Sequence, residues 1–202
     1  MLFSDKYKEI QSSHEARYIE RSSLFISLSF RVYSLENIKK HLFDVKKKYK
    51  KATHYCYAYI LNADKSFFKY DDDGEPSSTA GKQILNQLYS YDLTNILVIV
   101  VRYYGGKKLG ITGLIKSYKK ATIEVLIKSE IVTKYIKENF QIEFTYSQIN
   151  NIMNVVKKND LEIIESNFDL NCKLIFAVVR SNSEKVCNEF ITKLNIVPKY
   201  LN

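Results

Sequence analysis

The first third of the chain shows the hydrophobic patterns of a strand, a helix and a hairpin. Apolar and polar side chains alternate over residues 18–32, which predicts a strand. Apolar residues then recur at helical spacing in a lysine-rich stretch, which predicts a helix over residues 35–51. Residues 53–61 are rich in aromatic and β-branched side chains, and residues 65–70 are expected to pair with them as an antiparallel hairpin.

The middle of the chain has the clearest pattern. After a polar stretch, apolar spacing predicts a helix that begins at residue 77 or 79 and ends near residue 89. Residues 95–104 form a nearly continuous apolar run and should be a buried strand. Apolar positions every three or four residues predict a helix over residues 113–129, packed on the sheet.

The last third repeats no earlier pattern and has the element order β-α-β-β-α-β of a split ferredoxin-like unit. Strands are expected at residues 139–146, 162–168 and 172–179, helices at residues 147–158 and 183–194, and a short strand at the end. The sequence therefore predicts an α+β protein of two domains, residues 1–134 and residues 138–202.

Charge differs between these two parts. Residues 1–136 carry 23 Lys and Arg against 14 Asp and Glu, whereas residues 137–202 carry 8 of each. The whole formal charge of +9 thus lies in the first part, which favours an anionic partner such as a phosphate-rich surface. A generally lysine-rich composition without a nucleic-acid partner is the alternative.

The cysteines and the first residues indicate the compartment. Cys56, Cys172 and Cys187 lie far apart without a C-x-x-C spacing, so we expect free thiols rather than disulfides or a zinc site. The first 22 residues are charged throughout and lack the apolar core of a signal peptide. We therefore expect a cytoplasmic protein with no membrane partner.

Three segments carry motifs that match one family. They read ATHYCYAY at residues 52–59, DDGEPSSTAG at residues 72–81 and VRYYGGKKLGITGL at residues 101–114. In this order they resemble the IMPACT/YigZ family. The chain departs from the family pattern at Ser78 and Thr112, where glycine is usual, and at Gln83, where proline is usual.

The resemblance implies both a fold and a role. It implies a first domain similar to domain two of ribosomal protein S-five, and a ferredoxin-like second domain similar to the C-terminal end of elongation factor G. It also implies a role in translation, since eukaryotic relatives regulate translation through the general-control kinase pathway. RNA, the ribosome or a translation factor is therefore the expected partner.

The third motif has the features of an anion site. Its glycines let backbone N–H groups approach an anion, and the following helix start adds a positive dipole end. The candidate anion-binding or nucleic-acid-binding residues are Arg102, Gly105, Gly106, Lys107, Lys108, Gly110, Gly113, Lys116 and Lys120. A tight strand-to-helix turn that uses glycine for geometry alone is the alternative. The spacing matches neither a Walker A loop nor a dinucleotide fingerprint.

The other two motifs supply a second set of candidate site residues. They are His54, Cys56, Asp72, Asp73, Glu75, Ser77 and Thr79. The acids precede a helix, and their carboxylates interact favourably with the positive end of its dipole. Ser77, Ser78 or Thr79 can cap free N–H groups of that helix. A salt bridge to Arg102 or Lys107 is also expected if the loops meet. His54 and Cys56 alternate along a strand and should share one face, as a Cys-His site or as core packing. Four carboxylates near one turn could also bind Mg²⁺ or Ca²⁺, but no EF-hand spacing is present. Capping is therefore the leading interpretation, and we expect no bound metal and no cofactor.

A last cluster of charge lies on the first helix, where seven lysines accompany one acid within residues 39–51. It is either a solvated face or a phosphate-facing surface, and it forms one patch with Lys116, Lys119 and Lys120 if both helices cover the same side of the sheet. The leading interpretation is an RNA-binding or ribosome-binding factor without catalytic residues. The alternatives are an enzyme acting on a phosphorylated or nucleotide-like ligand, and a protein-interaction adaptor.

Overall fold

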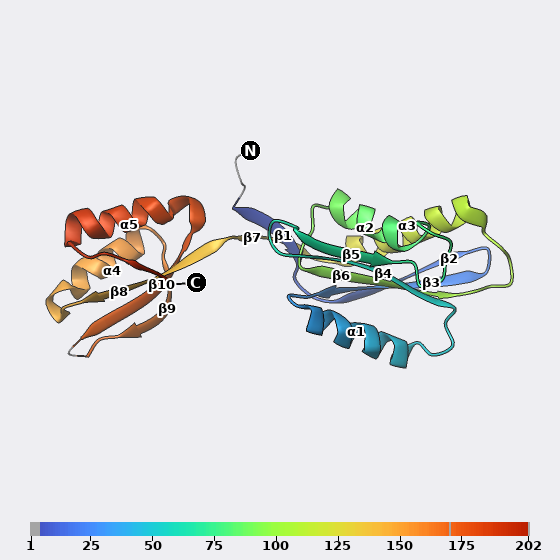
Figure 1. The fold of residues 1–202 in the computed structure, drawn as a ribbon, viewed down its shortest axis with the longest axis horizontal. Helices are drawn as coiled ribbons and strands as arrows, with labels where there is room; N and C mark the ends of the chain where they lie inside the picture. Colours follow the sequence, from blue (N-terminus) through green and yellow to red (C-terminus); the bar gives the residue numbers. More distant parts are fainter. Residues whose placement is uncertain (1–4, 170, 202) are drawn as a thin grey trace. The chain divides into compact units, whose positions relative to one another are not determined.

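The computed structural model describes residues 5–169 and 171–201, which form two compact units. Residues 6–134 make up the first unit, and residues 135–201 together with Asp5 make up the second. Both units combine helices with antiparallel sheet, so the α+β fold class is confirmed (Figure 1). None of the helices in the described residues is long and apolar enough to cross a membrane.

A five-stranded antiparallel sheet forms the centre of the first unit, in the order β2-β3-β6-β4-β5. Its strands are β2 (His14–Glu20), β3 (Ser23–Arg31), β4 (His54–Leu61), β5 (Phe67–Asp71) and β6 (Ile96–Tyr103). The helices are α1 (Leu35–Lys48), α2 (Gly81–Ser90) and α3 (Gly110–Lys128). A separate pair of strands, β1 (Lys6–Ile10) and β7 (Ile131–Tyr135), was not expected from the sequence.

Helices cover both faces of this sheet, with α1 on one side and α2 and α3 on the other (Figure 1). The central strand β6 explains why, because its side chains alternate between two separate cores. Val98 and Val100 pack in the core beneath α2 and α3, whereas Leu97, Ile99 and Val101 pack in the core beneath α1. A strand buried on both faces reads as a continuous apolar run, as residues 95–104 do.

The expected single strand over residues 18–32 is wrong, because the chain turns back within it. Arg21 and Ser22 both have positive φ, 43° and 67°, and join β2 to β3 as a tight hairpin. A two-residue hairpin with a type I′ turn needs positive φ at both turn positions, a role that usually falls to Asn-Gly. Since neither residue is glycine or asparagine, the sequence carried no turn signal there.

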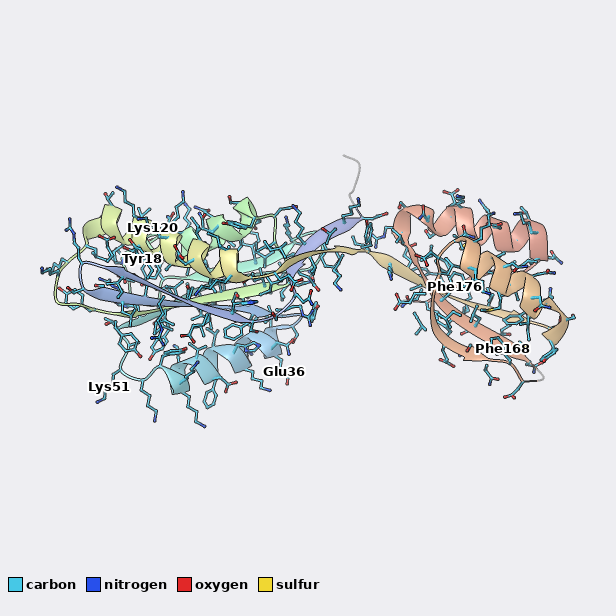
Figure 2. All side chains as sticks on the ribbon, turned by 180° about the vertical axis from the view of Figure 1, so that it is seen from behind. Tyr18, Glu36, Lys51, Lys120, Phe168 and Phe176 are labelled. Carbon is cyan, nitrogen blue, oxygen red and sulfur yellow. The ribbon has the colours of Figure 1, made fainter. Side chains whose placement is uncertain are left out.

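The second unit has the predicted β-α-β-β-α-β order, and its sheet order is β11-β8-β10-β9. Its elements are β8 (Lys137–Phe144), a short 3-10 helix (Tyr146–Gln148), α4 (Ile149–Lys158), β9 (Glu162–Asn167), β10 (Cys172–Val179), α5 (Arg180–Leu194) and β11 (Lys199–Leu201). Phe176 packs between Phe140 and Phe190 at the centre of the core. Figure 2 labels Phe176 on the sheet beneath the two helices.

Candidate functional site

The three motif segments meet at one end of β6, in the first unit. His54 begins β4, Glu75 lies in the turn before α2, and Arg102 lies near the end of β6. These residues line a cleft of about 420 Å³ together with Lys108 and Gly110 from the start of α3. The turn of residues 72–81 therefore lies beside the loop of residues 102–113, which is the condition for a salt bridge between them.

A buried ion pair joins the two loops. Arg102 Nη1 donates to Glu75 Oε1 over 2.6 Å, and both side chains are almost fully buried. The Tyr118 hydroxyl donates to the same carboxylate oxygen over 2.8 Å. Buried charges need such partners, because removing one partner leaves the other desolvated and unpaired. The predicted salt bridge from the acidic turn thus goes to Arg102, not to Lys107.

The ring of His54 is held by the acidic turn. Its Nδ1 lies 2.8 Å from the Asp73 carbonyl oxygen, which can only accept, so Nδ1 carries a proton. Its Nε2 lies 3.9 Å from Glu75 Oε1. His54 therefore reaches the cleft with a fixed ring orientation.

Cys56 lies on the same sheet face as His54, as its alternation along the strand predicted, but it is fully buried. Its thiol lies 3.0 Å from the Asp72 carbonyl oxygen and 3.3 Å from the Tyr118 hydroxyl. Burial raises the pKa of this thiol well above its ordinary value, which keeps it protonated. A buried protonated thiol is a poor nucleophile, which argues against Cys56 as the nucleophile of a Cys-His site.

The carboxylates of the acidic turn are used within the fold. Asp72 accepts from the backbone N–H groups of Ser78, Ala80 and Gly81 over 2.8, 3.0 and 2.8 Å, and thereby caps α2. Asp73 accepts from the N–H of Tyr55 over 2.7 Å. No group of three or more His, Cys, Asp and Glu side chains suited to a metal ion occurs in the described residues.

The expected caps of α2 are wrong, because Asp72 takes that place from outside the helix. The helix begins at Gly81 rather than at residue 77 or 79. The hydroxyl of Thr79 instead donates to the Pro76 carbonyl, and Ser77 is exposed. A carboxylate nine residues before the helix start leaves no capping signal in the local sequence.

The loop between β6 and α3 depends on glycine at two positions. A Cβ on Gly105 would lie 2.0 Å from the backbone of Ser22, so only glycine fits against the β2–β3 turn. Gly110 begins α3 with a φ of +70°, so that helix starts three residues earlier than expected. Gly106, Lys107 and Lys108 are exposed between them.

The remaining predicted residues line a second hollow of about 330 Å³ on another side of the α3 start. Gly113, Lys116 and Lys120 line it, together with Arg21 from the β2–β3 turn and one carboxylate, that of Glu20. The Lys120 ammonium lies 5.5 Å from the centre of the Tyr18 ring (Figure 2). A hydrogen bond to Glu20 raises the pKa of Tyr18 to about 12, so this hydroxyl stays neutral. The predicted anion site is therefore divided between two hollows.

The exposed cations around the start of α3 form what we call the α3 patch. It consists of Arg21, Lys107, Lys108, Lys116, Lys119 and Lys120. Among the described residues, none of these six forms an ion pair, whereas Lys46 and Lys48 of α1 pair with Asp73 and Glu15. These cations are thus free to meet an external anion.

The lysines of α1 do not join this patch. Figure 2 shows Lys120 on one side of the sheet, and Glu36 and Lys51 near the two ends of α1 on the other side. The condition for one common patch is not met. Periodicity assigns an apolar face to each helix but does not tell which side of the sheet it covers.

Three residues at the cleft or beside it are absent from the predicted site residues. Tyr118 was assigned to core packing by its helical spacing, yet its hydroxyl binds Glu75. Tyr104 and Ile111 flank the cleft and are exposed. The only sequence signal for Tyr118 was its position one turn after Leu114, next to the glycine loop.

Comparison with known proteins gives the family. The sequence model of the Impact N-terminal domain matches residues 21–126, more than half of the chain. The chain belongs to the IMPACT family. A Haemophilus influenzae IMPACT family member is 31% identical over 176 residues, which cover 86% of this chain and 84% of the relative.

One further relative and one solved structure span nearly the whole chain. The IMPACT family member YvyE of Bacillus subtilis is 28% identical over 188 residues, covering 93% of this chain and 86% of the relative. A crystal structure of a hypothetical protein covers 99% of both chains with a TM-score of 0.72 and 24% identity. This similarity shows that the two-unit fold occurs elsewhere. The site of this IMPACT-family chain lies in the part that the family model matches, since all three motif segments fall within residues 21–126.

Proposed function

We propose that this protein acts in translation by binding RNA through the α3 patch. The observation that supports the proposal is the set of six exposed cations around the start of α3, which have no ion pairs within the described residues. RNA affinity arises mainly from cations that contact phosphates, so unpaired exposed lysines are suited to it. The link to translation rests on the family resemblance.

Salt-dependent RNA binding tests the proposal. The full chain is titrated into a labelled single-stranded RNA at several salt concentrations. Replacing Lys116, Lys119 and Lys120 by glutamine should weaken binding to all sequences alike and reduce the slope of log affinity against log salt by about 2, since each lost contact with a single strand removes about 0.7.

The chain offers a matched control for this variant. Lys39, Lys40 and Lys47 of α1 are also exposed, and their replacement by glutamine removes the same charge from the opposite face of the sheet. This control should bind RNA as the unmodified chain does. Equal weakening by both triple variants would mean that net charge alone matters and would refute the α3 patch.

An enzyme acting on a phosphorylated or nucleotide-like ligand is the second candidate. The observation that favours it is the presence of His54, Glu75 and Arg102 in one cleft. Release of inorganic phosphate from mononucleotides, measured for the unmodified chain and for His54→Gln, tests it. Absence of turnover, or equal turnover by both proteins, would contradict a catalytic His54.

A further inference from the structure

Arg102 lines the cleft beside the α3 patch and carries a hydrogen-bond donor that the described residues leave unused. Arg102 is only 5% exposed, and its Nε is a buried atom without a hydrogen-bond partner in the described residues. Its Nη1 is already satisfied by Glu75. Buried polar groups are almost always paired, so an unpaired guanidinium nitrogen in the wall of a cleft indicates a missing acceptor.

A second set of unused donors faces the same cleft. The helix α3 is 19 residues long, and its N-cap residue Leu109 makes no side-chain hydrogen bond, so N–H groups of the first turn have no side-chain acceptor among the described residues. Gly110, with its positive φ and no Cβ, lines the cleft at this point. A helix start of this kind favours an anion through both its N–H groups and its dipole. Lys108 adds a full positive charge beside it.

Glu75 does not prevent an anion from binding here. Its carboxylate accepts from Arg102 and from Tyr118, so its charge is matched by one cation and one hydroxyl. Lys108 forms no ion pair with a described residue and remains in excess. The cleft is therefore net positive at the α3 start.

The rest of the cleft wall is apolar and suits a flat ring. Tyr104 is 47% exposed and Ile111 is 64% exposed, and both lie at the cleft together with Pro76. The Arg102 guanidinium lies 5.6 Å from the centre of the Tyr104 ring, so this ring already packs against a cation. Exposed tyrosines next to cations are typical positions for base stacking.

We propose that this cleft binds a phosphorylated nucleotide. Its phosphate lies at the start of α3 against Lys108 and Arg102, and its base stacks on Tyr104. The same chemistry is present in a free mononucleotide and in the phosphate-bearing end of a single-stranded RNA. The RNA source rests on the function proposed above, because the strand would continue onto the α3 patch.

The neighbouring surface favours a nucleotide over the C-terminal carboxylate of a peptide, which would fit the same cation and apolar wall. Lys107 lies next to Lys108 in the loop, and Leu109 lines both the cleft and the second hollow. Lys116 and Lys120 line that second hollow. A row of cations beyond the cleft matches the repeated phosphates of a strand, whereas a peptide end offers one charge.

Binding by the full chain to two sets of probes tests the proposal. The first set is adenosine, adenosine 5′-monophosphate and adenosine 3′-monophosphate, followed by calorimetry. The second set is one short RNA with hydroxyl ends, with a 5′-phosphate or with a 3′-phosphate, followed by fluorescence anisotropy. A phosphate at one end should strengthen RNA binding at least tenfold, and the matching mononucleotide should bind where adenosine does not.

Variants locate the effect in the cleft. Lys108→Gln and Tyr104→Leu should each weaken binding of the phosphorylated probes by about tenfold, as expected for a charge-assisted contact and a stacked base. Lys47→Gln on α1 should leave it unchanged. Since Arg102→Gln leaves Glu75 unpaired and endangers the fold, the double variant Arg102→Gln, Glu75→Gln is used instead, with circular dichroism to check its folding.

The outcomes separate this inference from the proposed function. Equal affinity for phosphorylated and hydroxyl-ended RNA would overturn the cleft site and leave RNA binding by the α3 patch intact. Mononucleotide binding without any RNA binding would support the cleft and overturn the proposed function. A peptide with a free C-terminal carboxylate that binds more tightly than the mononucleotides and displaces them would also overturn the nucleotide site.

Discussion

Ser78 stands in the left-handed backbone region, with a φ of +63°, at a position where the family resemblance leads us to expect glycine. Its hydroxyl makes no hydrogen bond to a described residue. Its backbone N–H donates to Asp72 over 2.8 Å, and its carbonyl accepts from the Gln83 side chain over 2.8 Å. Both backbone bonds would remain in the variant Ser78→Gly, so the substitution changes the conformational cost alone.

The magnitude follows from two opposing terms. A residue with a Cβ in the left-handed region costs about 1–2 kcal/mol, and glycine loses about 0.5–1 kcal/mol more backbone entropy on folding. Ser78→Gly should therefore raise the free energy of unfolding by about 0.5–1 kcal/mol. Thr112, the other position where glycine is usual, is the control.

Thr112 lies in the first turn of α3 and is not among the described residues with positive φ. Thr112→Gly should therefore lower the free energy of unfolding by about 0.3 kcal/mol, the difference between the two helix propensities.

The assay must report on the first unit, because two units need not unfold together. The chain has no tryptophan and 16 tyrosines, so urea unfolding is followed by circular dichroism and tyrosine fluorescence. Hydrogen exchange in peptides from β6 then measures the opening of this unit alone. If Ser78→Gly destabilised the unit as Thr112→Gly does, the strain assigned to Ser78 would be refuted.

Two further predictions concern carboxylates. Asp72→Ala should lower the free energy of unfolding by about 2–3 kcal/mol, because three backbone N–H groups lose their acceptor. Asp72→Asn keeps one acceptor oxygen and should lower it by about half as much. Equal urea midpoints for the two variants and the unmodified chain would contradict the capping role. Lys158, then Lys193 and Asn159, hold the pKa of Glu189 down to about 2. Because the folded-state pKa is lowered, this stabilisation is present above pH 4.5 and is lost as the pH falls toward 2, so unfolding curves of Glu189→Gln should converge with those of the unmodified chain across that window.

The spacing of apolar residues predicted those helices and strands whose buried positions follow from their own sequence. The strand β6 and all of α3 except its first three residues were placed correctly, because continuous burial and helical spacing leave direct traces in the sequence. The turn at Arg21 and Ser22 and the first turn of α2 were misplaced for one common reason. In both cases the local sequence carries no signal of the geometry. The hairpin turn has positive φ at two residues that are neither glycine nor asparagine, and the N–H groups at the start of α2 donate to the distant Asp72 carboxylate.

Charge was the feature that the sequence located least well. A net charge of +9 in the first part of the chain does not describe one surface, because α1 and α3 pack on different cores of the same sheet. The two helices also differ in how their charge is used. On α1, Lys46 and Lys48 pair with acids of the same unit while Lys39, Lys40 and Lys47 do not, whereas none of the cations of the α3 patch has such a partner among the described residues. The acids of the turn also have partners within the unit: Glu75 pairs with Arg102, and Asp72 and Asp73 accept from backbone N–H groups. Exposed cations without an ion pair to a described residue therefore lie on both faces of the sheet, and the face that α1 covers is the matched control for every binding experiment on the α3 patch.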